Sequence, residues 1–213
     1  MNIIDCEQDS PEWHAARCGK VTASRIADIV RKTKTGISAS RNTYMGQLVA
    51  ERLSGQVTEG FTSKAMEWGK ETEDKAIAFY AFMRDSAALK IGFVIHPSID
   101  MSGASPDRLI DDDGLIEVKC PNSATHIATL LGAPVDPDYV KQMQWQMACT
   151  GRKWCDFVSF DPRMPSDMCI HQRRVHRDPV FIAELEHSVS VFLAEVDATV
   201  AQLLATYRHS VAA

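Results

Sequence analysis

The stretch that decides the fold is residues 105–119, which read SPDRLIDDDGLIEVK. Two apolar-rich runs flank an Asp/Gly turn, a pattern typical of a β-hairpin. Side chains alternate along a strand, so Glu117 and Lys119 share one face and Val118 points to the other. Asp107 lies on the first run. It reaches the face of Glu117 and Lys119 only if the connecting loop has an odd number of residues.

We therefore predict a three-residue loop at 112–114, with its glycine in the left-handed conformation of a G1 bulge. This loop pairs Asp111 with Leu115 and places Asp107 opposite Lys119. Two carboxylates and a lysine on one face suit a site that binds a divalent metal and hydrolyses a phosphate ester. A salt-bridged surface hairpin would contain the same residues, so both interpretations stay open at this point.

Composition indicates one ordinary globular domain spanning residues 1–213. Hydrophobic residues make up 45% of the chain and charged residues 24%, which is typical of a folded protein with a sizeable core. Six cysteines occur without a C-x-x-C pair, so we expect reduced thiols, a cytoplasmic location and no zinc or iron–sulfur site. The acidic N-terminus does not resemble a secretory signal, and no apolar run suggests a membrane partner.

Charge is distributed unevenly although the net charge is only -5. Residues 14–41 contain seven basic residues and a single acid, Asp28. A solvated surface and a phosphate-facing segment explain this run equally well.

Apolar periodicity and capping residues predict the remaining elements. We expect helices at about 11–18, 26–31, 42–53, 64–84, 124–131, 138–150 and 178–207, and strands at 91–95, 154–160 and 168–175. Thr22 or Ser24 is expected to cap the second helix and Ser123 the fifth, and 33–40 is expected to be a mobile loop. This order predicts an α/β protein with a mixed sheet flanked by helices.

Several motifs around the hairpin make its interpretation more specific. They are WHAARCG at 13–19, VTAS at 21–24, WGK at 68–70, SPD at 105–107, EVKCP at 117–121, QMQ at 142–144 and FDPRM at 160–164. Together with the PD-(D/E)xK pattern of Asp107, Glu117 and Lys119, these motifs resemble the phage lambda exonuclease family, also called YqaJ-like viral recombinases. The resemblance covers nearly the whole chain.

The resemblance implies a restriction-endonuclease-like PD-(D/E)xK core and a Mg²⁺-dependent 5′→3′ exonuclease, with Mn²⁺ as a substitute and one or two ions. Such an enzyme degrades one strand of linear double-stranded DNA from 5′-phosphorylated ends. It releases mononucleotides and leaves a 3′ single-stranded tail for recombination by strand annealing. The implied partners are two further copies in a ring-shaped homotrimer and a single-strand annealing protein, in a bacterial or phage-infected cell.

Carried over by position, the resemblance also implies roles for single residues. Metal ligands would be Asp107, Glu117, Glu73 and the backbone carbonyl of Val118. Lys119 would activate the attacking water, and Gln142 would help to position that water or complete the shell of a second metal. The 5′-phosphate would be held by Arg17, Thr22, Ser24 and Ser105. Further DNA contacts would come from Lys64, Met66, Arg31, Lys32, Lys34 and Arg41, although a core position is an equal alternative for Met66.

Two other functions compete with this one. A structure-selective or nicking DNA endonuclease of the same superfamily would share the acidic site, but it needs no pocket for a terminal phosphate around Arg17. A non-catalytic DNA-end-binding scaffold would not need intact Asp107, Glu117 and Lys119.

Overall fold

The computed structural model describes residues 1–33, 36–58 and 64–208, and only the backbone of residues 65 and 66. Its larger sheet consists of β5 (Ala88–Leu89), β8 (Arg108–Ile110), β9 (Gly114–Lys119), β10 (Trp154–Phe160) and β11 (Ile170–His176). The strand order is β11-β10-β9-β8-β5. Strands β9 and β10 are parallel and the other pairs are antiparallel. The predicted mixed sheet is therefore confirmed.

A smaller sheet and a short ribbon complete the β structure. The smaller sheet has the order β1-β6-β7-β2, with β1 at Asn2–Ile4, β2 at Val21–Thr22, β6 at Phe93–Ile95 and β7 at Ser102–Ala104. Strands β3 (Lys32–Thr33) and β4 (Gly36–Ile37) pair with each other. The expectation of a mobile loop at 33–40 is wrong on this point, because Thr33 pairs with Gly36 and a helix begins at Ala39.

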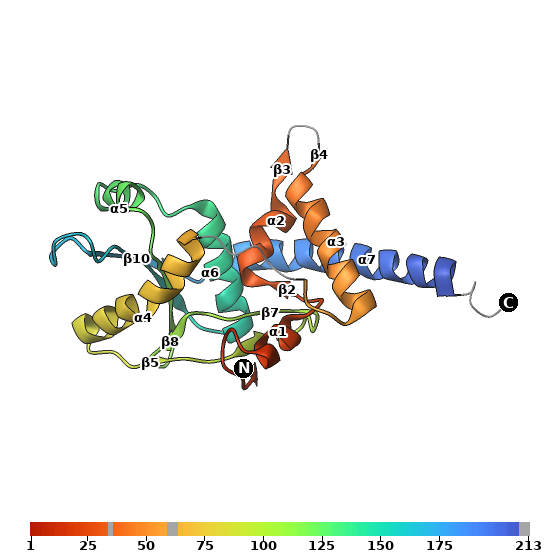
Figure 1. The fold of residues 1–213 in the computed structure, drawn as a ribbon, viewed down its shortest axis with the longest axis horizontal. Coiled ribbons are helices and arrows are strands. Elements are labelled where there is room, and N and C mark those ends of the chain that lie inside the picture. The colour runs from red at the N-terminus through yellow and green to blue at the C-terminus, as the bar shows by residue number, and fades with distance from the viewer. Residues whose placement is uncertain (34–35, 59–63, 209–213) are drawn as a thin grey trace.

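Seven α-helices surround the sheets in the described part of the chain (Figure 1). They are α1 (Pro11–Arg17), α2 (Ile26–Val30), α3 (Ala39–Ser54), α4 (Lys64–Arg84), α5 (Ser123–Leu130), α6 (Pro137–Thr150) and α7 (Pro179–Arg208), and a 3₁₀ helix, η1 (Ala23–Arg25), precedes α2. All seven predicted helices are present. Ser10 caps α1 through the Trp13 backbone N–H, and left-handed glycines end α3 and α6 at Gly55 and Gly151.

Two capping predictions are wrong. Neither Thr22 nor Ser24 caps α2, whose first flanking residue is Arg25. Asn122, not Ser123, caps α5 by accepting from the Thr125 N–H at 2.9 Å. The Ser123 hydroxyl instead donates to the buried carboxylate of Asp161 at 2.7 Å. The Ser123 side chain therefore bonds to a residue distant in the chain, and the preceding residue caps the helix.

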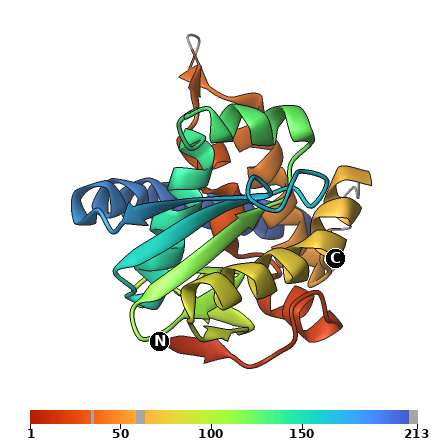
Figure 2. The same cartoon turned by 90° about the vertical axis from the view of Figure 1, so that its left-hand side faces the viewer.

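The larger sheet is covered on both faces. Ala76, Ile77 and Tyr80 of α4 pack against one face, and Met143 and Met147 of α6 pack against the other. Figure 2 shows α4 beside the strands of this sheet. Helices α2, α3, α6 and α7 share a third core with the smaller sheet. The edge of the hairpin that carries the acidic residues is thus held between α4 and α6.

By length and composition alone, helix α7 is the one described helix that could cross a membrane, a test that the core helix of a globular protein also passes. It contributes Ile182, Leu185 and Phe192 to the core. Beyond this packed part the helix extends away from the body of the molecule (Figure 1).

The hairpin has the predicted parity, but its loop lies one residue earlier than predicted, so each residue pairs two positions away from its predicted partner. Ile110 pairs with Gly114, so the three-residue loop is Asp111–Asp113. Continuing this register places Asp107 level with Glu117, not with Lys119 as predicted. Both alternatives leave an odd loop, and Asp107 therefore stays on the face of the other acidic residue.

The residues that shape this loop differ from the prediction. The left-handed residue is Asp111, with φ 44°, and its carboxylate accepts from the Ala87 N–H at 3.0 Å. Gly114 is required for space instead, because a Cβ there would lie 2.1 Å from the Trp154 ring. The Arg152 guanidinium donates to the carbonyls of Ile110, Asp111 and Gly114.

Candidate active site

Three carboxylates from two segments converge at the end of the hairpin. Asp107 and Glu117 come from the hairpin, and Glu73 comes from α4. Burial raises the pKa of Asp107 well above its usual range, and the charges of Glu117 and Glu73 raise it further. Burial also raises the pKa of Glu73, although the Arg108 guanidinium opposes this rise. The carboxylates are thus close enough to oppose one another's ionisation.

Lys119 lies within this cluster. Its ammonium group donates to Glu117 Oε1 and lies 4.8 Å from the centre of the Tyr139 ring. Burial alone would lower the pKa of Lys119, but Glu117 and Asp107 outweigh it and raise the pKa above its usual value. Lys119 is therefore protonated at neutral pH in the metal-free chain.

Helix α6 supplies two further hydrogen bonds to Glu117. Gln142 Nε2 donates to Glu117 Oε1 at 2.8 Å, and Gln146 Nε2 donates to Glu117 Oε2 at 2.7 Å. The two glutamines are four residues apart and so lie on one face of the helix. Sequence reasoning selected Gln142 and missed Gln146. The signal that could have found it is this i, i+4 spacing of amides in a helical segment that is otherwise buried.

A guanidinium without an acidic partner lies next to the carboxylates. Arg17 stacks on Trp13, with 3.7 Å between its Cζ and the ring centre, and no ion pair to it is found among the described residues. Burial lowers the pKa of Arg17 to about 10, partly offset by Tyr44 and Asp9. The Trp13 indole N–H donates to the Ser105 hydroxyl at 2.8 Å. Arg17 is therefore held in place but keeps its donors free for an anion.

One cavity of about 200 Å³ joins the two groups. Its wall includes the predicted phosphate-binding residues Arg17, Thr22, Ser24 and Ser105 and the predicted catalytic residues Glu73, Asp107 and Gln142. A larger cavity of about 560 Å³ continues from Arg17 towards Tyr44, Gln47 and Arg25. The fold thus brings members of both predicted groups to a single hollow, although they come from segments far apart in the chain. Glu117 and Lys119 are not among its lining residues.

The donor set at this hollow fits a hard divalent cation. Asp107, Glu117 and Glu73 offer carboxylate oxygens, and burial together with neighbouring negative charge raises the pKa of Asp107 and of Glu73. Among the described residues, no group of three or more His, Cys, Asp or Glu side chains is arranged so that it could hold a metal ion. Mg²⁺ can bind through one or two carboxylates and keep several waters, so fewer protein ligands would suffice.

Comparison with known proteins identifies the family of this chain. The model of the YqaJ-like viral recombinase domain matches residues 12–153. The chain belongs to this family. A search of curated protein sequences found no match.

Solved structures agree with the YqaJ-like assignment. An alkaline exonuclease from Laribacter hongkongensis is 48% identical with a TM-score of 0.87, and the match covers 94% of this chain and 99% of that one. The same exonuclease in complex with dAMP gives the same values. A phage-related exonuclease from Haemophilus somnus 129PT is 16% identical with a TM-score of 0.67, covering 86% and 96% of the two chains. This last similarity supports the fold alone.

A buried arginine in this YqaJ-like site was missed by sequence reasoning. Arg108 follows Asp107 and is 7% exposed. It donates to the Asp107 carbonyl at 2.5 Å and to Asp74 at 2.6 Å, and it lies 3.7 Å from Glu73. Arg108 thus ties the hairpin to α4. A charged residue within an apolar strand was the available signal.

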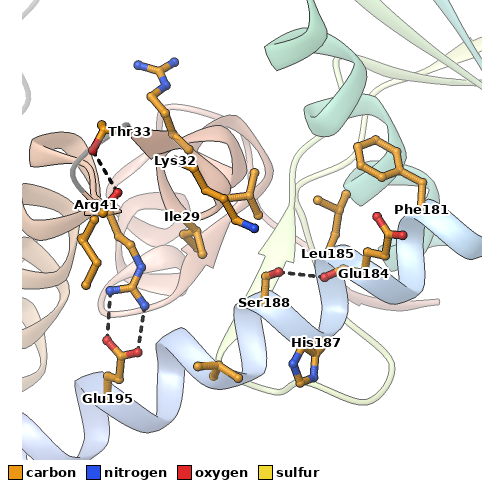
Figure 3. Close-up of a pocket in the computed structure, with 15 residues that line it drawn as sticks. Ile29, Lys32, Thr33, Arg41, Phe181, Glu184, Leu185, His187, Ser188 and Glu195 are labelled. Carbon is orange, nitrogen blue, oxygen red and sulfur yellow. Dashed lines mark hydrogen bonds and ion pairs between the residues drawn. The ribbon is translucent and has the colours of Figure 1, made fainter.

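Of the residues predicted to contact DNA outside the site, Arg31, Lys32 and Arg41 line one cavity, and Lys64 does not. Lys32 is exposed on the β3–β4 ribbon, and Lys64 is exposed at the start of α4. Arg31 pairs with Asp138. Arg41 forms a two-point ion pair with Glu195 at 2.9 Å, and these residues border a cavity of about 650 Å³ between the ribbon and α7 (Figure 3). Lys34 and the Met66 side chain lie outside the described residues.

Proposed function

We propose that this chain is a Mg²⁺-dependent 5′→3′ exonuclease that degrades one strand of linear double-stranded DNA from 5′-phosphorylated ends. Its products would be mononucleotides and a 3′ single-stranded tail suited to strand annealing. Family membership and the 48% identical alkaline exonuclease support nuclease activity on DNA. The complex of that relative with dAMP is consistent with a mononucleotide product.

One observation carries the proposed polarity. The cavity of about 200 Å³ is lined both by Arg17 with its hydroxyl neighbours and by the carboxylates of Asp107 and Glu73. A planar guanidinium suits a terminal phosphate because it can donate two parallel hydrogen bonds. A 5′-phosphate held there would bring the first phosphodiester of the same strand towards the acidic cluster.

The metal would be held by Asp107 and Glu117, with Glu73 and the Val118 carbonyl as further oxygen ligands. A bound divalent ion lowers the pKa of a water ligand and stabilises negative charge on the phosphate. Mn²⁺ would substitute for Mg²⁺, and one or two ions would bind.

Lys119 and Gln142 would act on the substrate side of the same cluster. Lys119 is protonated in the metal-free chain, so it supplies positive charge where negative charge develops on the phosphate. Its pKa would fall once Glu117 and Asp107 are neutralised, and in that state it could accept a proton from the attacking water. Gln142, which lines the cavity, would orient that water.

The test uses end-labelled linear duplex bearing either a 5′-phosphate or a 5′-hydroxyl, with Mg²⁺ or with chelator. We expect Mg²⁺-dependent release of mononucleotides, faster from the phosphorylated end. Equal cleavage of closed circular duplex would indicate the alternative endonuclease. Binding of ends without any cleavage would indicate the non-catalytic scaffold.

Replacing Arg17 tests the phosphate pocket directly. Arg17→Ala should reduce the preference for 5′-phosphate by about tenfold to a hundredfold, because hydrogen bonds to charged groups contribute about 1.5–3 kcal/mol. Arg17→Lys should restore part of it, since charge is kept and the planar fork is lost. Arg84→Ala, which removes an exposed arginine bonded to Gln172, is the control. An unchanged preference in Arg17→Ala would exclude this role.

Assembly and location remain part of the proposal and rest on the family resemblance. We propose a ring-shaped homotrimer, a single-strand annealing partner and a cytoplasmic location. Light scattering on the purified chain tests the trimer, and a monomer at micromolar concentration would contradict it.

A further inference from the structure

Glu117 is the most completely bonded carboxylate in the site. Lys119 and Gln142 both donate to Oε1, and Gln146 donates to Oε2. A carboxylate has about four lone-pair positions. The three donors therefore leave one free position, on Oε2. The side chain is 1% exposed, so bulk water does not compete freely for it.

Gln146 differs from the other two donors in its surroundings. It is fully buried at 0% exposed, whereas Gln142 lines the cavity. The amide oxygen of Gln146 accepts a weak hydrogen bond from the Cys155 thiol at 4.0 Å. A buried amide costs free energy unless it is hydrogen-bonded. The bond to Glu117 is therefore the interaction that compensates for placing an amide at this position.

The bond also restricts how the Glu117 carboxylate can turn. Without a donor on Oε2, both oxygens could rotate towards the Lys119 ammonium, which already contacts Oε1. With Gln146 in place, Oε1 faces Lys119 and Gln142, and Oε2 keeps its single free position. The orientation of the carboxylate is thus set from the buried side of α6.

We propose that Gln146 is a positioning residue that holds Glu117 in the orientation that binds the divalent cation. This inference rests on the proposed function, because it assigns Glu117 as a metal ligand. Partners that orient metal ligands typically change metal affinity by about 10- to 100-fold when they are removed.

The experiment compares Gln146→Met with Gln144→Met. Methionine has nearly the length of glutamine and fills the same space without the amide. Gln144 lies on the same helix and is buried, but its amide bonds to the His176 carbonyl and the Asp178 N–H, away from the acids. Direct Mn²⁺ binding is measured by electron paramagnetic resonance, and thermal unfolding and Mg²⁺-dependent cleavage are measured alongside.

We expect both variants to unfold at lower temperature than the wild type. Only Gln146→Met should bind Mn²⁺ about 10- to 100-fold more weakly and need correspondingly more Mg²⁺ for half-maximal cleavage. Saturating Mg²⁺ should recover most of its maximal rate. Mn²⁺ binding within twofold of the wild type, or an equal loss in Gln144→Met, would overturn the proposal.

Two further arms separate this inference from the proposed function. If the wild type binds Mn²⁺ and cleaves DNA while Gln146→Met behaves like it, only the positioning role fails. If the wild type binds no Mn²⁺, the proposed function and the positioning role fail together. Should Gln146→Met not fold, Gln146→Asn keeps the amide but is one carbon too short to reach Glu117. The same loss of Mn²⁺ affinity is expected, and wild-type affinity would overturn the proposal.

Discussion

Asp107 shows how the environment of one residue determines its chemistry. Its carboxylate accepts from the Val118 N–H at 2.6 Å, which favours the ionised form. Burial and the neighbouring charges of Glu117 and Glu73 favour the protonated form and prevail. A carboxylate in this balance ionises fully only when a positive charge joins the site. If the proposed metal binds here, Asp107 would couple its binding to pH.

The raised pKa of Asp107 has a consequence for stability. The folded-state pKa lies above the unfolded value of about 4, so between the two values the folded chain holds more protons. The stability contributed by protonated Asp107 is therefore lost as pH rises through the folded-state pKa. An asparagine at position 107 cannot ionise, and its amide oxygen can still accept the hydrogen bond from the Val118 N–H.

We accordingly expect Asp107→Asn to unfold at a higher temperature than the wild type in metal-free alkaline buffer. The difference should shrink towards acid pH, and 1 kcal/mol corresponds to about 2–4 °C for a chain of this size. Added Mg²⁺ should stabilise the wild type alone. Asp112→Asn, on the exposed loop, is the control. Calorimetry across pH checks the prediction, and a difference independent of pH would contradict it.

At the scale of elements, the hairpin loop determines which side chains reach the active site. Its odd length keeps Asp107 on the face of Glu117, and Arg152 holds its carbonyls in place. Gly114 begins β9 against the Trp154 ring. That ring is fixed by a hydrogen bond from its indole N–H to Asp113 and by Arg174 stacked at 3.5 Å.

Gly114→Ala should therefore destabilise the fold by about 1–3 kcal/mol, the usual cost of overpacking a well-packed site. The new Cβ would meet a ring that cannot move without losing both contacts. Gly46→Ala is the matched control, because no heavy atom lies within 4 Å of its Cβ. In helix α3 it should add about 0.5–1 kcal/mol. Urea unfolding measures both, and a Gly114→Ala midpoint equal to that of the wild type would be inconsistent with a rigid Trp154.

At the scale of the molecule, the fold gathers one site from four separate segments. The α1–η1 region supplies Arg17 and Ser24, the proposed phosphate-binding residues, and α4 supplies Glu73. The hairpin supplies Asp107 and Glu117, and α6 supplies the two glutamines. The β3–β4 ribbon projects from the same body (Figure 1) and carries the exposed Lys32. We propose that this ribbon contacts the DNA backbone beyond the active site.

Lys32→Ala should weaken duplex binding equally for different sequences and reduce the slope of log affinity against log salt by about 0.9. A phosphate contact contributes in this way because binding releases a counterion. Lys153→Ala is the control, since Lys153 pairs with Asp113 on the hairpin loop, at the other end of β9 from Lys119. Fluorescence anisotropy over a salt series measures the slope. An unchanged slope in Lys32→Ala would remove the ribbon from the DNA-binding surface.

Helix boundaries, the face of the acidic residues and the family can all be predicted from local sequence. Helix boundaries follow from residues such as Ser10, Gly55 and Gly151, because caps and left-handed glycines act within a few residues. The acidic face of the hairpin follows from strand alternation together with an odd loop, because a two-residue change in pairing leaves Asp107 on the same face. The motifs around Arg17, Asp107 and Glu117 were sufficient to indicate the family.

Only the tertiary structure decided the rest. Strands of two or three residues, such as β2 and β5, form because distant segments lie beside them. Gln146 and Arg108 acquire their partners from other elements, and Ser123 bonds to Asp161 instead of capping its own helix. Gly114 is glycine because of a tryptophan forty residues later in the chain. Contacts of this kind depend on where the chain returns in space, and residue spacing carries no direct record of that.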